Sequence, residues 1–261
     1  MKLTFIKNIF IAASAAALIT ACGTEHDLLQ DIQTATGARV KFFHAAPDAP
    51  GVALYVNDKK LSGVLTISPA TPGVITYGNI YPSTDYALVE AGAAKARLIV
   101  PASGTTGETT VFSGTVPVED NKYYSVFATG LAPTYGAVLI QDNLPDFNER
   151  QVFFRVVNMV PNATAVSLSL AGATYAEKIE FGKASAFVPY NVAADFKGGA
   201  IAISGFNIKA DGAANVTNTS TLNFTGLTGG RAITIVLRGV LPTTVGGTTK
   251  YPITASFYTN R

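Results

Sequence analysis

The chain carries two copies of one pattern, and this repetition constrains its fold more than any other feature. The segment VKFFHAAPDAPGVALYV (40–56) aligns with FRVVNMVPNATAVSLSL (154–170) when their shared proline is superposed. Further along, NKYYSVFATGLAPT (121–134) aligns with GRAITIVLRGVLPT (230–243). Self-similarity of this kind indicates one structural unit that is used twice. Each copy spans roughly 105–110 residues, the size of a single β-sandwich.

Short runs of Val, Ile, Phe, Tyr and Thr alternate with Gly, Pro, Asn and Asp within each copy. Apolar residues recur at every second position in GVALYVND (51–58), KARLIVPA (95–102) and KYYSVFAT (122–129). This period predicts strands, and turn residues about every 8–12 positions predict sandwiches. No stretch has a helical period. We therefore expect an all-β protein with two tandem immunoglobulin-like antiparallel β-sandwich domains.

The domain boundaries follow from the alignment and from a polar stretch between the copies. We place the first sandwich at residues 38–142, a linker at 143–150 and the second sandwich at 151–261. The linker holds a proline and several polar side chains, as inter-domain linkers do. A second polar segment, within residues 206–224, has no counterpart in the first copy and predicts an exposed loop that binds partners.

Oxygen-bearing side chains gather at the boundary between the two copies and form a candidate calcium site. They are Asp142, Asp146, Asn148 and Glu149. Calcium takes about 6–8 oxygen ligands, and an ion held here would stiffen the connection between the sandwiches. The spacing lacks the glycine and the distant glutamate of an EF-hand, so we favour a solvated linker. We assign no metal and no cofactor to the chain.

The N-terminus predicts export. Lys2 and Lys7 form a basic head, and an apolar run follows at residues 9–19. That run is shorter than the ~20 residues that a membrane-spanning helix needs. A basic head, an apolar middle and small residues in this order are typical of a secretory signal peptide, which we place at residues 1–21.

The sequence Ile-Thr-Ala-Cys at residues 19–22 resembles the lipobox of bacterial lipoproteins. The resemblance implies cleavage before Cys22 and acylation of this residue, which would anchor the protein to a membrane. Residues 22–37 then form the lipidated N-terminus and a polar tether. We expect an exported lipoprotein at the outer membrane or cell surface of a Gram-negative bacterium. Because Cys22 is the only cysteine, we expect no disulfide and no cysteine nucleophile.

Charge gives little indication of a partner. The chain carries 19 Lys and Arg against 17 Asp and Glu, so loss of Lys2 and Lys7 with the signal peptide leaves 17 against 17. A neutral chain without a basic stripe argues against nucleic acid binding. We expect the membrane as one partner, through Cys22, and a surface protein or a glycan as another.

The segment VKFFHAAPDAPGVALYVNDKKL (40–61) resembles the opening of a bacterial family of domains of unknown function, DUF4397. Members begin with a strand, then His-Ala-Ser/Ala-Pro-Asp-Ala-Pro, then a strand that ends in a short turn. The second copy departs from this pattern with Asn158, Asn162 and Thr164 in place of the histidine, the aspartate and the second proline. The resemblance implies a β-sandwich on exported, often surface-anchored proteins, and it implies no activity.

The corner after the first strand of each copy holds the candidate site residues. In the first copy they are His44, Pro47, Asp48 and Pro50, and in the second they are Asn158, Pro161 and Asn162. Asparagine can replace the hydrogen bonds of histidine or aspartate, but not their proton transfer. We therefore interpret both corners as structural turns, in which proline fixes the backbone and Asp or Asn bonds nearby amides. We assign no catalytic residue.

Three functions remain open. A non-enzymatic module for binding, adhesion or envelope assembly accounts best for the duplicated sandwich and the shortage of catalytic groups. A carbohydrate-binding accessory lipoprotein of a glycan-uptake system would need exposed tyrosines, such as Tyr77, Tyr81 and one of the pair Tyr123 and Tyr124. A hydrolase would have to use His44, because the only other histidine lies in the tether.

Overall fold

The computed structural model describes residues 36–62, 73–193, 199–213 and 216–261. The predicted signal peptide, Cys22 and all but the last residues of the tether lie outside this part of the chain. Residues 37–261 form one compact unit. Among the described residues, no helix is long and apolar enough to cross a membrane.

The described residues form strands and contain no α-helix, which confirms the predicted all-β fold class. The strands are β1 (Ala38–His44), β2 (Ala53–Val56), β3 (Lys59–Lys60), β4 (Ile80–Tyr81), β5 (Ala87–Val89), β6 (Gly92–Val100), β7 (Thr109–Val118), β8 (Tyr123–Leu131), β9 (Thr134–Gln141), β10 (Gln151–Met159), β11 (Ala163–Leu170), β12 (Ala173–Ile179), β13 (Val188–Asn191), β14 (Ile201–Gly212), β15 (Thr217–Leu227), β16 (Ala232–Arg238) and β17 (Thr254–Thr259).

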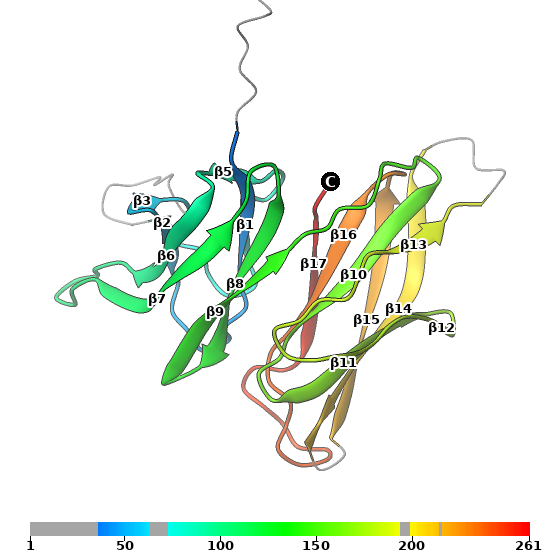
Figure 1. Ribbon diagram of the computed structural model, residues 1–261. Helices are drawn as coiled ribbons and strands as arrows, with labels where there is room; N and C mark the ends of the chain where they lie inside the picture. The colour runs from blue at the N-terminus through cyan, green and yellow to red at the C-terminus, as the bar shows by residue number, and fades with distance from the viewer. Residues whose placement is uncertain (1–35, 63–72, 194–198, 214–215) are drawn as a thin grey trace, which may run out of the picture. The chain divides into compact units, whose positions relative to one another are not determined.

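Two sheets make the first sandwich, and Figure 1 shows them as two layers. One has the order β4-β1-β8-β9, with β5 also paired to β1, and the other has the order β3-β2-β6-β7. Alternating side chains such as Val40, Phe42, Leu54 and Leu98 point between the layers and are almost fully buried. The period-two pattern of the sequence therefore produces this core directly.

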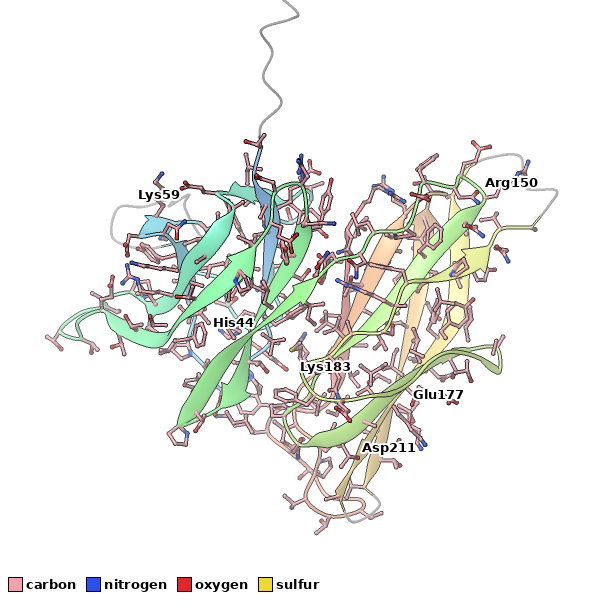
Figure 2. The ribbon with its side chains drawn as sticks, viewed as in Figure 1. His44, Lys59, Arg150, Glu177, Lys183 and Asp211 are labelled. Carbon is pink, nitrogen blue, oxygen red and sulfur yellow. The ribbon has the colours of Figure 1, made fainter. Side chains whose placement is uncertain are left out.

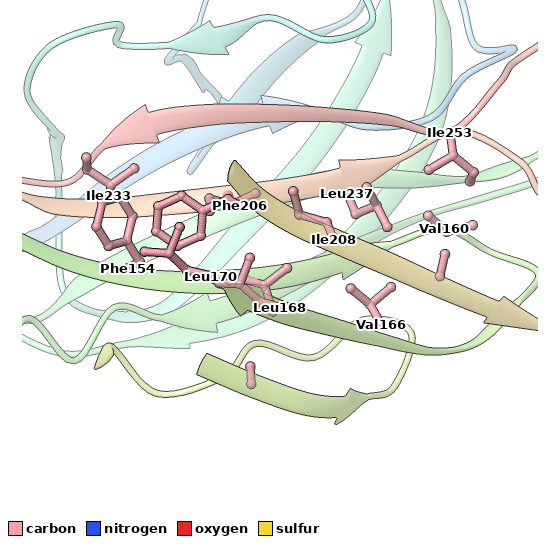
Figure 3. Close-up of a cluster of buried hydrophobic side chains, with 14 of the residues drawn as sticks. Phe154, Val160, Val166, Leu168, Leu170, Phe206, Ile208, Ile233, Leu237 and Ile253 are labelled. Atoms are coloured by element: carbon pink, nitrogen blue, oxygen red, sulfur yellow. The ribbon is translucent and has the colours of Figure 1, made fainter. Parts of the chain in front are cut away.

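The second sandwich repeats the arrangement with the orders β13-β10-β16-β17 and β12-β11-β14-β15. Phe154 and Phe206 lie together in its core (Figure 3). The ring of Phe154 lies 4.6 Å from that of Phe206 and 5.2 Å from that of Phe224, measured between centroids. These tilted pairs have geometries that aromatic side chains prefer, so they add to the stability that burial alone provides.

Strand pairing shows that the first strand and its parallel partner are equivalent in the two copies. In each copy the first strand runs parallel to a late strand: Arg39 pairs with Tyr123 in β1 and β8, and Phe153 pairs with Ala232 in β10 and β16. All other strand pairs are antiparallel. The sandwiches thus share one topology, with one parallel pair in each.

Most of the polar segment at residues 206–224 lies in strands, whereas the sequence-based expectation was an exposed loop. It forms the long hairpin of β14 and β15, in which Asn207 pairs with Thr221 and Lys209 pairs with Thr219. β15 lies at the edge of its sheet, and its side chains are exposed or half-buried except for Phe224. A polar strand is stable here because only one of its faces meets the core.

A third apolar cluster joins the sandwiches. It contains Phe43, Ala45 and Phe127 from the first sandwich and Val157, Met159, Val236 and Tyr258 from the second. These residues alternate with the ones that fill the two sandwich cores, so β1, β8, β10 and β16 are buried on both faces. The equivalent faces of the two copies therefore pack against each other. We call this contact the junction.

Candidate functional site

His44 ends β1 and is completely buried (Figure 2). Its Nε2 atom donates a hydrogen bond to the carbonyl of Pro50, at 3.0 Å, which fixes the tautomer because a carbonyl can only accept. Its Nδ1 atom has no partner among the described residues. Burial lowers the pKa of His44, so the ring stays neutral and holds the corner closed.

Asn158 takes the place of His44 in the second copy and is also fully buried. Its amide donates to the carbonyl of Ile179 at 3.0 Å and accepts from the amide of Val160 at 3.0 Å. Both corner residues thus bond to the backbone of their own sandwich. Neither residue lines either of the two clefts described below.

Asp48 and Asn162 bond to distant backbone rather than to neighbouring amides. Asp48 accepts a hydrogen bond from the amide of Ala132 at 2.9 Å. Asn162 accepts from the amide of Leu241 at 2.9 Å and donates to the carbonyl of Leu241 at 2.9 Å. Because Ala132 and Leu241 are equivalent in the repeat, each corner is fastened to the same later turn of its own sandwich.

The four calcium candidates do not converge. Asp142 is buried, whereas Asp146, Asn148 and Glu149 are exposed. Asn148 uses its side chain locally, since Oδ1 accepts from the amide of Arg150 at 3.0 Å. In the described ranges, no group of three or more His, Cys, Asp or Glu side chains is arranged to hold a metal ion.

Asp142 instead forms the centre of a buried polar network at the junction. Its Oδ1 atom accepts from Nη2 of Arg155, which forms an ion pair across the two sandwiches. Its Oδ2 atom accepts from the hydroxyls of Tyr86 at 2.8 Å and Ser125 at 2.7 Å, and from the amide of Asn260 at 3.3 Å. Oδ1 thus accepts one hydrogen bond and Oδ2 accepts three, from donors of both copies.

Two further side chains of the second sandwich complete this network. Tyr258 lies 2.7 Å from the oxygen of Ser125 and donates to it, because the proton of Ser125 already points at Asp142. Thr234 accepts from Nε of Arg155 at 2.8 Å. Burial and then the charge of Asp142 raise the pKa of Tyr258 to about 12. The same two causes raise the pKa of Tyr86.

Lys41 is the second buried cation of the junction. Its ammonium group donates to the carbonyls of Pro82, Thr84 and Asp85, at 3.3, 2.9 and 2.7 Å, and lies 4.8 Å from the ring centroid of Tyr86. Burial lowers its pKa to about 8, and the charges of Asp85 and Asp142 oppose that shift. Carbonyl oxygens therefore satisfy all three of its protons.

The network is built from equivalent positions of the repeat. The registers of the paired strands match Lys41 with Arg155, Tyr86 with Phe187, Ser125 with Thr234 and Asp142 with Asn260. Each cation also lies over the aromatic ring that matches, since Arg155 is 4.7 Å from the centroid of Phe187. The contact is thus isologous, since both copies use the same surface. Its charges are not symmetric, because only one copy supplies a carboxylate.

A cleft lies on each side of this network. The first, of about 470 Å³, lies between residues 83–85 and residues 226–231 and 259–261, and we call it the arginine cleft. The second, of about 540 Å³, lies between Leu139–Asn143 and residues 182–187, and we call it the twin cleft. Lys183 marks the twin cleft in Figure 2. Both volumes lie within the ~300–1,000 Å³ of small-molecule sites.

The tyrosines proposed for sugar stacking are mostly engaged with other side chains. Tyr124 is buried, and its hydroxyl accepts from the amide of Glu119 at 3.1 Å. Tyr123 packs edge-on against Tyr86, with a centroid separation of 5.0 Å. Tyr77 is covered by the guanidinium of Arg238 at 4.3 Å from its centroid. Three of the four tyrosines proposed for stacking, Tyr77, Tyr123 and Tyr124, are therefore engaged by other groups of the protein.

Sequence reasoning missed Lys41, Tyr86, Arg155 and Asn260. The repeat alignment had matched Lys41 with Arg155, and a cation within an apolar strand in both copies is the signal that could have located the junction. Asp142 was instead grouped with the linker, because it directly follows a strand and precedes polar residues. Its burial depends on contacts that no local pattern records.

Comparison with known proteins gives one clear assignment. No curated protein matches the chain. One solved structure, from Bacteroides fragilis NCTC 9343 and described as a "putative cell adhesion protein", is 10% identical. Its alignment covers 85% of this chain and 98% of that chain with a TM-score of 0.21, which is too low to carry an argument.

The family described as "Domain of unknown function (DUF4397)" matches residues 38–169. The match spans the first sandwich from β1 and continues through β10 and nearly all of β11 of the second. It thus includes both first strands, and with them Lys41, Arg155 and the two corners. Since it covers just over half of the sequence, the chain belongs to the DUF4397 family.

Proposed function

We propose that the protein is a lipid-anchored, non-enzymatic binding module of the cell envelope, whose two sandwiches act as one rigid body. The observation that carries this proposal is the buried ion pair of Asp142 and Arg155, which joins the copies. Breaking such a pair leaves a buried charge without a partner, at a cost of about 3–5 kcal/mol. An interface held in this way favours a binding surface of fixed shape over motion of one sandwich relative to the other.

The environment of His44 supports a non-enzymatic role. A general base must reach the proton that it abstracts, directly or through one water. His44 is 0% exposed, and Nε2 is already bonded to the carbonyl of Pro50. The carboxylate of the same corner, Asp48, is bonded to the amide of Ala132 instead. The geometry around His44 therefore argues against a hydrolase that uses this residue as its base.

The membrane anchor rests on the sequence, because Cys22 lies outside the described residues. The proposal is tested by metabolic labelling of cells with a palmitate analogue, followed by fractionation. The wild-type protein should carry the label and sediment with membranes, whereas Cys22→Ser should be unlabelled and released from the membrane. A wild-type chain that is exported without label would contradict anchoring.

Surface exposure and rigidity are tested separately from the anchor. Protease treatment of intact cells distinguishes an outward-facing protein from a periplasmic one, and only exposure supports adhesion to other cells or surfaces. Limited proteolysis of the purified chain should spare the segment at residues 143–150 if the sandwiches act as one body. Rapid cleavage there, giving two stable halves that separate, would contradict the rigid-body part of the proposal.

A further inference from the structure

The arginine cleft contains a half-buried arginine, Arg261, with two buried nitrogens that have no partner among the described residues. The Nε and Nη2 atoms of Arg261 are inaccessible to solvent and make no hydrogen bond with any described residue. The guanidinium carbon lies 6.0 Å from the ring centroid of Phe147, a cation–π contact that does not satisfy these donors. Buried donors left unpaired cost about 1–3 kcal/mol each, and more when charged, so they indicate a missing acceptor.

Arg231 brings a second guanidinium to the same cleft. Arg231 is exposed, and its Nε atom donates to the hydroxyl of Thr228 at 3.0 Å. Two guanidinium groups that line one cleft favour an oxyanion, because each offers a planar fork of donors. The hydrogen bond to Thr228 orients the Arg231 fork in advance.

The other residues that line the arginine cleft indicate which kind of anion it would bind. Loop 83–85 and Thr228 contribute hydroxyl groups, and Asp85 contributes a carboxylate. Hydroxyl and carboxylate groups suit a ligand that itself carries several hydroxyls. With two positive side chains and one negative, the cleft favours a single negative charge over a double one.

We propose that the arginine cleft binds a hydroxyl-rich monocarboxylate, such as the uronic acid unit of an acidic glycan. Arg261 and Arg231 bind the carboxylate, and the polar side chains of loop 83–85 bind hydroxyl groups. This inference deepens the proposed binding function, on which it rests, by naming the ligand class.

The twin cleft explains why the site occurs once. By the register of β9 and β17, Asn143 occupies the position that corresponds to Arg261. Loop 83–85 is also peculiar to the first copy. Ile80 and Ala87, which both pair with β1, are seven positions apart in the chain. Ala184 and Val188, which both pair with β10, are only four positions apart. The first copy is therefore three residues longer here, and the additional residues line the arginine cleft.

The test is calorimetric titration of the purified full chain with D-glucuronate, D-glucose and D-glucose 6-phosphate. Glucuronate should bind, and the other two should bind at least ~10-fold more weakly, because a buried charge-assisted hydrogen bond contributes about 1.5–3 kcal/mol. Equal binding of glucose would overturn the role of the arginines. Tighter binding of the phosphate would overturn the carboxylate, and absence of all binding would overturn the site.

Variants separate the cleft from the fold. Arg261→Gln and Arg231→Gln should each weaken glucuronate binding roughly 10- to 100-fold. Asn143→Ala in the twin cleft and Arg97→Gln on the surface should leave it unchanged. Urea unfolding of each variant checks that the sandwiches are intact. Because labelling at Cys22 is measured independently, loss of glucuronate binding with normal anchoring would refute this site and leave the proposed envelope function standing.

Discussion

Lys41 and Arg155 occupy equivalent positions in the two first strands, yet they satisfy their buried charges in different ways. Arg155 crosses the junction to the carboxylate of Asp142. Lys41 stays within its own sandwich and is enclosed by carbonyls of the loop before Tyr86. The position that would give Lys41 a carboxylate across the junction holds Asn260.

Replacement of Arg155 by methionine should destabilise the protein strongly. It keeps the volume of the side chain but leaves Asp142 as a buried charge without its cation, so the free energy of unfolding should fall by about 3–5 kcal/mol. Arg97→Met is the matched control, because Arg97 pairs with Asp58 at the surface and should cost less than ~1 kcal/mol. Urea denaturation measures both, and similar losses in the two variants would contradict a structural role for the buried pair.

His44→Asn should remove an acid sensitivity. Burial lowers the pKa of His44 in the folded state, so the unfolded chain binds more protons as pH falls below ~6.5. Stability of the wild type should therefore drop from that pH down to the lowered folded pKa and then level off. The variant copies Asn158 of the second sandwich and should have a flatter profile below pH 6.5. At pH 8 His44 is neutral in both the folded and the unfolded wild type, which gives the internal reference.

A profile of His44→Asn that falls as steeply as that of the wild type would show that other groups cause the acid loss. Thermal unfolding at several pH values between 5 and 8 is sufficient to decide, since only the difference between the two chains matters.

Stability should rise between about pH 8 and ~10 because of Lys41. Its pKa of about 8 in the folded protein lies below the ~10.4 of an unfolded lysine, so the unfolded state holds more protons in that window. Above pH ~10 the direction reverses, because the raised pKa values of Tyr86 and Tyr258 keep these hydroxyls protonated only in the folded state. Denaturant unfolding from pH 7 to 11 should show a maximum near pH 10. Lys41→Met should lose the rising part, and retention of the rise would exclude Lys41 as its source.

Exchanging the corner residues between copies should be asymmetric. Asp48→Asn keeps the oxygen that accepts from the amide of Ala132, so unfolding should change by less than ~0.5 kcal/mol. Asn162→Asp loses the donor to the carbonyl of Leu241 and sets two oxygens against each other, so it should cost about 1 kcal/mol or more. Chemical denaturation of both variants measures these changes. Equal effects would mean that the hydrogen bond to the later turn does not contribute to stability.

The fold class was predictable because strand periodicity is local. Runs such as GVALYVND place Leu54 and Val56 on one face, and the core forms as that alternation requires. β15 was misassigned because threonine and asparagine at an exposed edge lack an apolar alternation. The domain boundaries at 142 and 151 stay a prediction, since residues 37–261 behave as one compact unit.

The junction was less predictable, although a signal was present. VFFRVVNM in β10 is apolar at successive positions, which is typical of a strand buried on both faces. The assumption of two separate sandwiches left no place for a second buried face. The partners of Asp142 come from residues as far as 118 positions away, so only the three-dimensional structure brings them together.

The isologous junction has a consequence for assembly. When both faces belong to one chain, a short connection sets their effective concentration at about the millimolar level, so weak intrinsic affinity suffices to keep them associated. Such a contact can tolerate the desolvation of Lys41, Arg155 and Asp142, which a contact between independent molecules at micromolar levels would have to overcome in each encounter. Covalent duplication thus keeps the two faces associated although burying their charged groups costs free energy. The residues that line each of the two flanking clefts can then differ in charge from those of the other cleft.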